Sequence, residues 1–289
     1  TGLAVGTPVV LGGHDYLCGA LPVGAFREGV ILDVSGTWEI VLASIPAPVL
    51  TPEAQRTGVT VEAHVARNLY TVWGGAVSSD MLEWYRREYG GEARLRAEQC
   101  GGADWDFLMA DAAGSPVGAR GAMFLPHMSG AGCPVVDSRS LAGFIGLSSF
   151  VTKSDMLRAV IEGLDYQFVD IVRTMQDDLG VAFDKLVVVG GAVRNKFWMQ
   201  NKADMVGQII EAPAVEDASP LGAAMLGGIG VGIYRDEQDA FEHVWKPGAT
   251  FEPDLQVTAR YADLLPIYKQ IYGALAPVSH QIYDHFLSS

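Results

Sequence analysis

The stretch Pro8-Val9-Val10-Leu11-Gly12-Gly13-His14-Asp15 anchors our interpretation of the fold. Its apolar first half, residues 8–11, predicts a buried strand. The two glycines let the backbone bend and let another molecule approach closely. Asp15 then stands at the end of that strand, where open α/β sheets place their ligands, and it would be positioned to take a proton from an attacking hydroxyl. The alternative is an ordinary turn in which Asp15 caps a helix that starts near Leu17.

The composition bounds the size of the fold and the class of its partners. With 289 residues, of which 49% are hydrophobic, the chain can bury the core of one large domain or two ordinary ones. Its formal net charge of −14 argues against nucleic acid and anionic membrane surfaces as partners. A bound phosphate must therefore be held by backbone dipoles or a few placed cations, not by the overall field.

Cysteine usage and the chain start indicate the compartment. Three widely spaced cysteines, Cys18, Cys100 and Cys133, favour reduced thiols in a cytoplasm over a disulfide framework or a zinc site. No charged and then apolar leader is present, and the longest apolar stretch, residues 221–234, is too short to span a membrane. The chain begins with Thr1 and not with Met, so we expect a fragment or a processed chain.

The first half of the chain is rich in predicted strands. Residues 29–35 and 39–43 predict a hairpin closed by Gly36-Thr37. Such a turn presents amides and one hydroxyl outward and can hold a phosphate, although most hairpin turns hold nothing. Further elements are two strands and then a helix, at 59–65, 69–73 and 79–85. The polar, glycine-rich region 90–121 follows them without a clear assignment beyond one short helical piece.

The second half alternates helices with strands. The periodicity over 152–179 predicts a long helix, which Thr152 caps with Asp155 as its capping-box partner. The buried strand 186–189 runs into Gly190-Gly191-Ala192-Val193-Arg194-Asn195 and a helix through Met205. The remaining expectations are a closely packed helix with Ser219 as N-cap and Pro220 at its first position, and a docking helix from Val257. The whole pattern predicts an α/β fold.

Several chemistries are disfavoured by the motifs that the sequence lacks. Neither the dinucleotide-binding Gly-x-Gly-x-x-Gly after a strand nor a Walker A loop occurs, and there is no Gly-x-Ser-x-Gly elbow of an esterase. The six histidines show no His-x-x-x-His spacing, which makes a hydrolase metal centre a weak alternative. What remains are Asp15, the Gly36-Thr37 turn and the Gly190-Gly191-Ala192 turn. Together they suggest a nucleotide lying across a sheet with a carboxylate at its phosphate end.

The order of several motifs resembles the FGGY family of carbohydrate kinases. The motifs are Gly6-Thr7-Pro8-Val9-Val10-Leu11-Gly12-Gly13-His14-Asp15, Asp33-Val34-Ser35-Gly36-Thr37, Gly190-Gly191-Ala192-Val193-Arg194-Asn195 and Ala218-Ser219-Pro220-Leu221-Gly222-Ala223-Ala224. The stretch 142–162 is similar to the C-terminal signature of that family, in the segments Ala142-Gly143-Phe144-Ile145-Gly146-Leu147, Asp155-Met156 and Ala159-Val160-Ile161-Glu162.

The resemblance implies an actin-like, RNase H-like ATPase fold, of which this chain is the C-terminal half. Residues 1–8 would end an interdomain linker and 9–289 would form the nucleotide-binding domain, with an insertion at 90–121 and a docking helix at 255–289. It implies ATP and Mg²⁺ as cofactors, with no metal ligand assigned in this chain. The implied partners are a small sugar or polyol, the N-terminal domain of the same kinase and, as a further expectation, a second copy in a homodimer.

The resemblance also assigns site residues. Asp15 would be the base that deprotonates the sugar hydroxyl, with His14 and Tyr16 beside it at the substrate. The nucleotide would be contacted by Gly36, Thr37, Gly190, Gly191, Ala192 and Asn195, and more loosely by Ser79 and Glu83.

Two departures from the family qualify these expectations. The N-terminal domain, which supplies most sugar contacts and the carboxylate associated with Mg²⁺, is absent, so the isolated chain is expected to bind nucleotide weakly and to transfer phosphate poorly. The loop 129–134 lacks the Gly-Glu-Arg-Ser-Pro often found there, which weakens any choice of sugar. The competing interpretation is a non-catalytic, actin-like nucleotide-binding module, which would not need a carboxylate at position 15.

Overall fold

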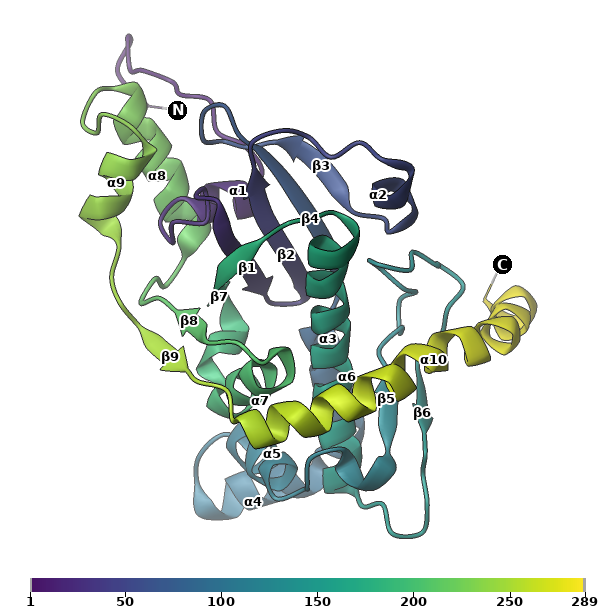
Figure 1. Cartoon of the computed structure of the whole chain (residues 1–289). Helices are drawn as coiled ribbons and strands as arrows, with labels where there is room; N and C mark the ends of the chain where they lie inside the picture. The colour runs from purple at the N-terminus through teal and green to yellow at the C-terminus, as the bar shows by residue number, and fades with distance from the viewer. Residues whose placement is uncertain (1, 288–289) are drawn as a thin grey trace.

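A seven-stranded mixed sheet forms the centre of the computed structural model, which describes residues 2–287 (Figure 1). The strand order is β3-β4-β2-β1-β7-β8-β9. Strand β1 pairs antiparallel with β2 and parallel with β7, so it joins an antiparallel half to a parallel half. The strands of this sheet are β1 (Gly29–Ser35), β2 (Trp38–Ile45), β3 (Thr60–Ala63), β4 (Tyr70–Val77), β7 (Phe183–Val189), β8 (Ile210–Ala212) and β9 (Ala249–Phe251). A separate two-stranded sheet contains β5 (Met123–Leu125) and β6 (Gly143–Ile145).

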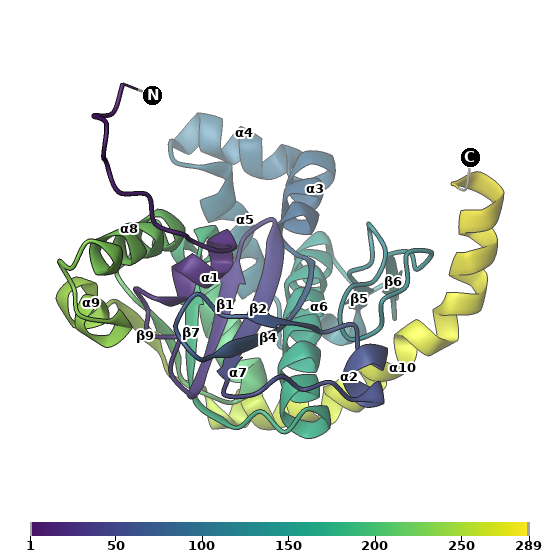
Figure 2. The same ribbon diagram turned by 90° about the horizontal axis from the view of Figure 1, so that it is seen from above.

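Helices cover both faces of the large sheet, as expected for an α/β fold (Figure 2). One face packs against α1 (Asp15–Ala20) and α8 (Ala218–Gly230). The other face packs against α6 (Lys153–Arg173) and α7 (Lys196–Val206), with α3 (Ser79–Tyr89) beside them. The alternation of side chains along β1 explains both layers, because Val30 and Leu32 face α1 while Ile31 faces α6.

The long helix predicted at 152–179 is confirmed, including its cap. Thr152 Oγ1 accepts a hydrogen bond from the Asp155 amide, and the Asp155 carboxylate accepts one from the Thr152 amide. The helix continues as one π-helical stretch, η2 (Thr174–Asp178), and ends before Gly180. Most of α6 is buried, because this helix lies between the sheet and the elements outside it.

Close packing of α1 on α8 explains why α8 is rich in small residues. A methyl group on Gly222 would lie 1.8 Å from the carbonyl oxygen of Cys18, so only glycine fits there. The prediction of Ser219 as the N-cap of this helix is wrong by two residues. Helix α8 begins at Ala218, and its N-cap is the extended residue Asp217. Ser219 and Pro220 therefore lie inside the first turn, where a backbone N–H would have no partner within the helix, so the missing N–H of proline costs nothing.

The strand predicted over residues 8–11 is wrong. This run lies in an extended, exposed segment that leads away from the body of the molecule (Figures 1 and 2), and Val9 and Leu11 are 95% and 92% exposed. Both sides of β1 are already paired, and the edges of the sheet are β3 and β9. The apolar run pairs with none of these strands, and it is not part of the sheet.

The region 90–121, which the sequence left unassigned, is largely helical. It contains α4 (Gly91–Cys100), α5 (Asp104–Ala113) and the short helix η1 (Ala119–Gly121), of which α5 and η1 pack against α6. The shorter helices elsewhere are α2 (Pro52–Arg56), η3 (Gly191–Arg194) and α9 (Glu237–Val244).

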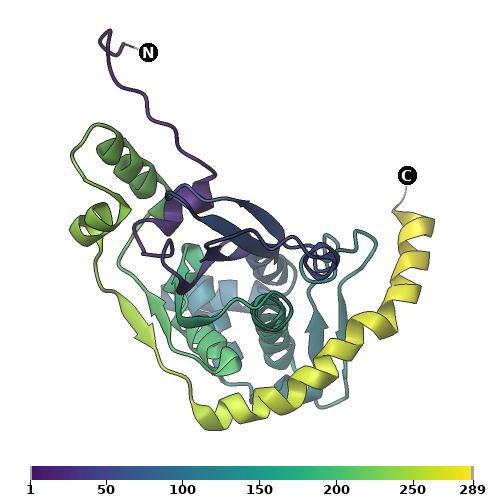
Figure 3. The same ribbon diagram turned by 45° about the horizontal axis from the view of Figure 1, so that its top comes forward.

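The range 255–289, predicted as a docking helix, contains α10 (Leu255–Phe286), and its residues 288–289 lie outside the described residues. The first half of α10 runs along the edge of the molecule and buries Tyr261 and Tyr268, whereas its last turns project outward (Figure 3). Within residues 2–287 we find no helix with the length and apolar character needed to cross a bilayer.

Candidate functional site

The two glycine turns predicted to hold phosphate lie next to each other. Strands β1 and β7 are parallel and pair Val34 with Val189, so both strands end at the same edge of the sheet. Gly36 follows β1 and Gly190 follows β7 at that edge. Gly190 has a φ of 103°, and a methyl group on it would lie 2.4 Å from the carbonyl oxygen of Ser35. Glycine is therefore required where the second turn passes the first.

The start of α3 holds the Gly36-Thr37 turn in place. The amide of Ser78 donates to the carbonyl of Thr37 at 2.8 Å, and the amide of Ser79 donates to the carbonyl of Gly36 at 3.1 Å. Both turn carbonyls are thus bound to the helix, and Thr37 is left as an exposed residue of the turn. The positive end of the α3 dipole lies beside the turn, which favours an anion there.

Glu83 lies one turn farther along α3 than Ser79 and is committed to an ion pair. Its carboxylate accepts from Arg86 at 2.5 Å, and Arg86 also donates to Asp104 at 2.8 Å. The structure thus brings Gly36, Thr37, Ser79 and Gly190 together, and it places Glu83 next to this group without a direct bond to the turn.

Asn195 has a structural partner at each end of its side chain. Its Oδ1 accepts from the amide of Trp198 at 3.1 Å as the N-cap of α7, and its Nδ2 donates to Met109 Sδ. Ala192 is buried within η3, whereas Gly191 is exposed, and a methyl group on Gly191 would meet no atom within 4 Å. Of the second turn, Gly191 is therefore the residue most open to a ligand.

Asp15 is the first residue of α1, which lies on the face of the sheet opposite to α6 and α7. His14 is the N-cap, so the alternative in which Asp15 caps a later helix is wrong. The residue is exposed, and its Oδ1 accepts from the amide of Tyr16 at 2.8 Å. Among the described residues no hydrogen bond joins Asp15 to either glycine turn.

A hydrogen-bonded cluster beside Asp15 was not predicted from the sequence. Glu62 accepts from the Tyr16 hydroxyl at 2.5 Å and from Trp73 Nε1 at 2.8 Å, and it lies 3.0 Å from His14 Nδ1. Burial, followed by the contact with Glu62, raises the pKa of Tyr16. The cluster fixes the two side chains that flank Asp15. A glutamate inside a predicted strand was the only signal for it.

A second unpredicted cluster lies beneath the Gly36-Thr37 turn and is completely buried. Lys202 Nζ donates to Asp33 Oδ2 at 2.7 Å and also to Glu39. The sequence signal was a lysine on the apolar face of the 196–206 helix, together with an aspartate in an otherwise apolar strand. Neither residue alone predicts the other as its partner.

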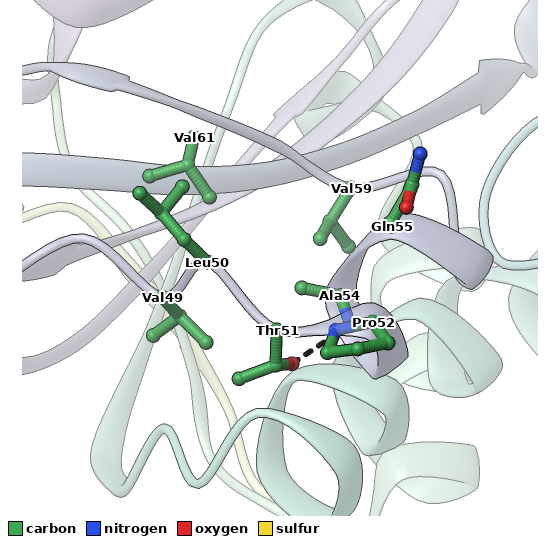
Figure 4. A pocket seen from close by; sticks show the side chains of 8 residues that line it. All are labelled: Val49, Leu50, Thr51, Pro52, Ala54, Gln55, Val59 and Val61. Carbon is green, nitrogen blue, oxygen red and sulfur yellow. Dashed lines mark hydrogen bonds between the residues drawn. The ribbon is translucent and has the colours of Figure 1, made fainter.

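A hollow of the structure lies elsewhere and is not the candidate site. Its volume is about 450 Å³, and it opens between α2 and β3, past the end of β2 that is remote from the turn (Figure 4). No titratable side chain lines it, and the hydroxyl of Thr51 is used to accept from the amide of Ala54. The lining residues are Val49, Leu50, Thr51, Pro52, Ala54, Gln55, Val59 and Val61.

In the part of the chain that the structure describes, no group of three or more His, Cys, Asp or Glu side chains is arranged to hold a metal ion. Mg²⁺ is commonly held by one or two carboxylates together with substrate phosphates.

Comparison with known proteins identifies what this arrangement is similar to. The family model described as "FGGY family of carbohydrate kinases, C-terminal domain" matches residues 33–231. This range contains both glycine turns but not Asp15. A xylulose kinase of Staphylococcus epidermidis is 28% identical over 277 residues, which cover 94% of this chain and 52% of the relative. A glycerol kinase of the same species is 37% identical over 142 residues, which cover 49% of this chain and 28% of the relative.

Solved structures agree with the sequence relatives. The xylulose kinase of Rhodospirillum rubrum superposes with a TM-score of 0.79 at 27% identity, covering 97% of this chain and 53% of that one. The chain thus spans about half the length of the xylulose kinases it matches. The fold is the predicted α/β, actin-like ATPase fold of these kinases.

Proposed function

The chain belongs to the FGGY family of carbohydrate kinases, and we propose that it carries the nucleotide site of an enzyme that transfers a phosphoryl group from ATP to a hydroxyl of a sugar or polyol. Its xylulose and glycerol kinase relatives support this substrate class. Because the chain spans about half of the xylulose kinases, we also propose that a further domain completes the sugar site.

The observation that carries the proposal is the meeting of two glycine turns at one sheet edge. Gly36-Thr37 and Gly190-Gly191 follow adjacent parallel strands, and α3 begins beside the first of them. Backbone amides and a helix N-terminus attract phosphate through local dipoles. This matters in a chain of net charge −14, where the overall field repels a triphosphate.

Asp15 is proposed as the general base. Its carboxylate is exposed and is held at the start of α1, so a substrate hydroxyl can reach it. It would take the proton of that hydroxyl as the hydroxyl oxygen attacks the terminal phosphorus of ATP. The bond between that phosphorus and the bridging oxygen would break, and ADP would leave with the bridging oxygen. Phosphoryl transfer depends mainly on such positioning and on charge stabilisation.

His14 and Tyr16 are proposed to contact the sugar. Both flank Asp15, and Glu62 holds them in a defined orientation. Mg²⁺ would neutralise charge on the ATP phosphates when bound. One or two carboxylates together with the ATP phosphates are the usual ligands of Mg²⁺ in such sites.

The test is a kinase assay of the full-length protein with ATP and a panel of ketoses and polyols. We expect ADP release that depends on one member of the panel, with one phosphate added per ADP formed. Binding of ATP without transfer to any member of the panel would contradict the kinase and would favour a non-catalytic nucleotide-binding module.

A further inference from the structure

The buried cluster beneath the first glycine turn has no role in the site described above. Lys202 and Asp33 are completely buried, and Glu39 is 1% exposed. Burying ionised groups is costly, and apolar residues of similar volume often stabilise a core equally well or better. A cluster of this kind therefore calls for a role other than core stability.

The position of the cluster relates it to the turn. Asp33 lies three residues before Gly36 on β1, and Glu39 lies two residues after Thr37 on β2. Lys202 of α7 donates to both carboxylates, so its ammonium clamps the two strands of the hairpin immediately behind their connection. Within residues 2–287, no other lysine or arginine forms an ion pair with this hairpin.

The second oxygen of Glu39 extends the clamp to α3. Ser78 Oγ donates to Glu39 Oε2 at 3.0 Å, and the amide of Ser78 donates to the carbonyl of Thr37. The chain of contacts thus runs from Lys202 through Glu39 and Ser78 to the turn itself. It connects α7, which follows the second glycine turn, with the hairpin that carries the first.

The rest of the surroundings hold the lysine side chain in place. Its Nζ lies 4.4 Å from the centre of the Phe168 ring and 5.6 Å from that of Trp198. Asp165 of α6 is fixed by Trp198 Nε1 and by Asn201 Nδ2. Burial raises the pKa of Asp165 to about 8 and also raises the pKa of Asp33, and the hydrogen bonds of Lys202 go to Asp33 and Glu39.

We propose that Lys202 is a positioning residue for nucleotide binding, which sets the relative placement of the Gly36-Thr37 turn and the Gly190-Gly191 turn through Asp33, Glu39 and Ser78. The proposal rests on the proposed function of the two turns. Lys202 does not touch the nucleotide, since the protein encloses it fully. It acts by holding two backbone segments at the separation that a phosphate chain requires.

The experiment compares Lys202→Met with Arg158→Met in the full-length protein. Arg158 is a matched control, because it is a buried cation that donates to a buried carboxylate, Glu162, at 2.7 Å. It lies two helical turns before Asp165 on α6 and makes no ion pair with Asp33 or Glu39, and it also donates to Asn201 Oδ1 at 3.3 Å. For each variant we would measure the melting temperature, the Kd of a non-hydrolysable ATP analogue by calorimetry, and the KM values of ATP and sugar.

We expect Lys202→Met to raise the Kd of the analogue and the KM of ATP about tenfold or more, with the KM of the sugar within about twofold. Arg158→Met is expected to lower the melting temperature with an unchanged Kd. An unchanged Kd in folded Lys202→Met, or an equal rise in both variants, would overturn the proposal.

A milder variant keeps the test decisive if Lys202→Met does not fold. Ser78→Ala breaks the link between Glu39 and the turn and leaves the Lys202 ion pairs intact. We expect a rise in the Kd of the analogue of about threefold to tenfold. No rise would overturn the proposal. A wild type that binds the analogue but phosphorylates no sugar would contradict the proposed function instead, and a weaker Kd in these variants would still support the role of Lys202.

Discussion

Gly190 passes so close to Ser35 that a single methyl group on it would lie 2.4 Å from the Ser35 carbonyl oxygen. The two residues belong to turns that are more than 150 positions apart in the sequence, and the parallel pairing of β1 with β7 brings them together. This contact fixes the spacing between the two backbone segments that we propose to bind phosphate.

Gly190→Ala is expected to damage both the fold and nucleotide binding. The left-handed φ and the steric clash together cost about 2–4 kcal/mol, and the second turn must move away from the first. Denaturant unfolding and calorimetric titration with an ATP analogue would measure the two effects.

Gly191→Ala is the control for that variant, because a methyl group there meets no atom within 4 Å. It should leave the free energy of unfolding within about 0.5 kcal/mol of the wild type. If the phosphates lie against this residue, the ATP analogue should nevertheless bind more weakly. Unchanged binding in Gly191→Ala would contradict a nucleotide contact at this turn.

Asp15→Asn is expected to remove sugar phosphorylation and to spare the fold. Loss of a general base lowers kcat by about 10²–10⁴-fold, while the Kd of ATP should stay within a few-fold because Asp15 contacts neither glycine turn. The side chain is exposed, so the melting temperature should not change. Steady-state kinetics of the full-length protein would measure this, and wild-type activity in the variant would reject the assigned base.

Gly222→Ala is expected to unfold or strongly destabilise the domain. The added methyl group would meet the Cys18 backbone at 1.8 Å and push α8 away from α1, at a cost of about 3 kcal/mol. Gly227 of the same helix has no such neighbour, so Gly227→Ala should stabilise by about 0.5–1 kcal/mol. Thermal unfolding followed by circular dichroism compares the pair, and similar losses in both would contradict the proposed helix contact.

His127 is expected to make the protein less stable in mild acid. Burial lowers its pKa to about 4, from about 6.5 in the unfolded chain. The unfolded state therefore binds more protons between these two values, and stability falls as the pH drops through this range, by up to about 3 kcal/mol.

The variant His127→Asn isolates this effect. It keeps a polar partner for Ser140, whose Oγ lies 2.7 Å from His127 Nδ1, and it cannot titrate. The loss of stability between pH 7 and pH 5 should be smaller in the variant than in the wild type. Equal losses would show that His127 is not a source of the acid sensitivity.

The sequence predicted best those features that local signals control. The hairpin around Gly36-Thr37 and the capped helix after Thr152 follow from turn chemistry, capping and periodicity, and both are confirmed. The strand predicted over residues 8–11 is wrong. An apolar run favours a strand locally, but a strand also needs a partner in the sheet, and this run has none.

The contacts that the sequence could not predict join residues far apart in the chain. Lys202 meets Asp33 only because α7 packs on the face of β1 that Asp33 occupies, a relation that no spacing along the sequence encodes. Glu62 likewise reaches Tyr16 through the packing of α1 on the sheet. The meeting of the two turns follows from a single parallel strand pair; the sequence predicted a strand before each glycine turn but not that these two strands are neighbours.

The most direct test of the central claim is a crystal structure of the protein with a non-hydrolysable ATP analogue. We expect phosphate density against the backbone of Gly36-Thr37 and Gly190-Gly191, with the terminal phosphate directed toward the side of the sheet edge where Asp15 lies. Phosphates bound away from both turns would contradict it.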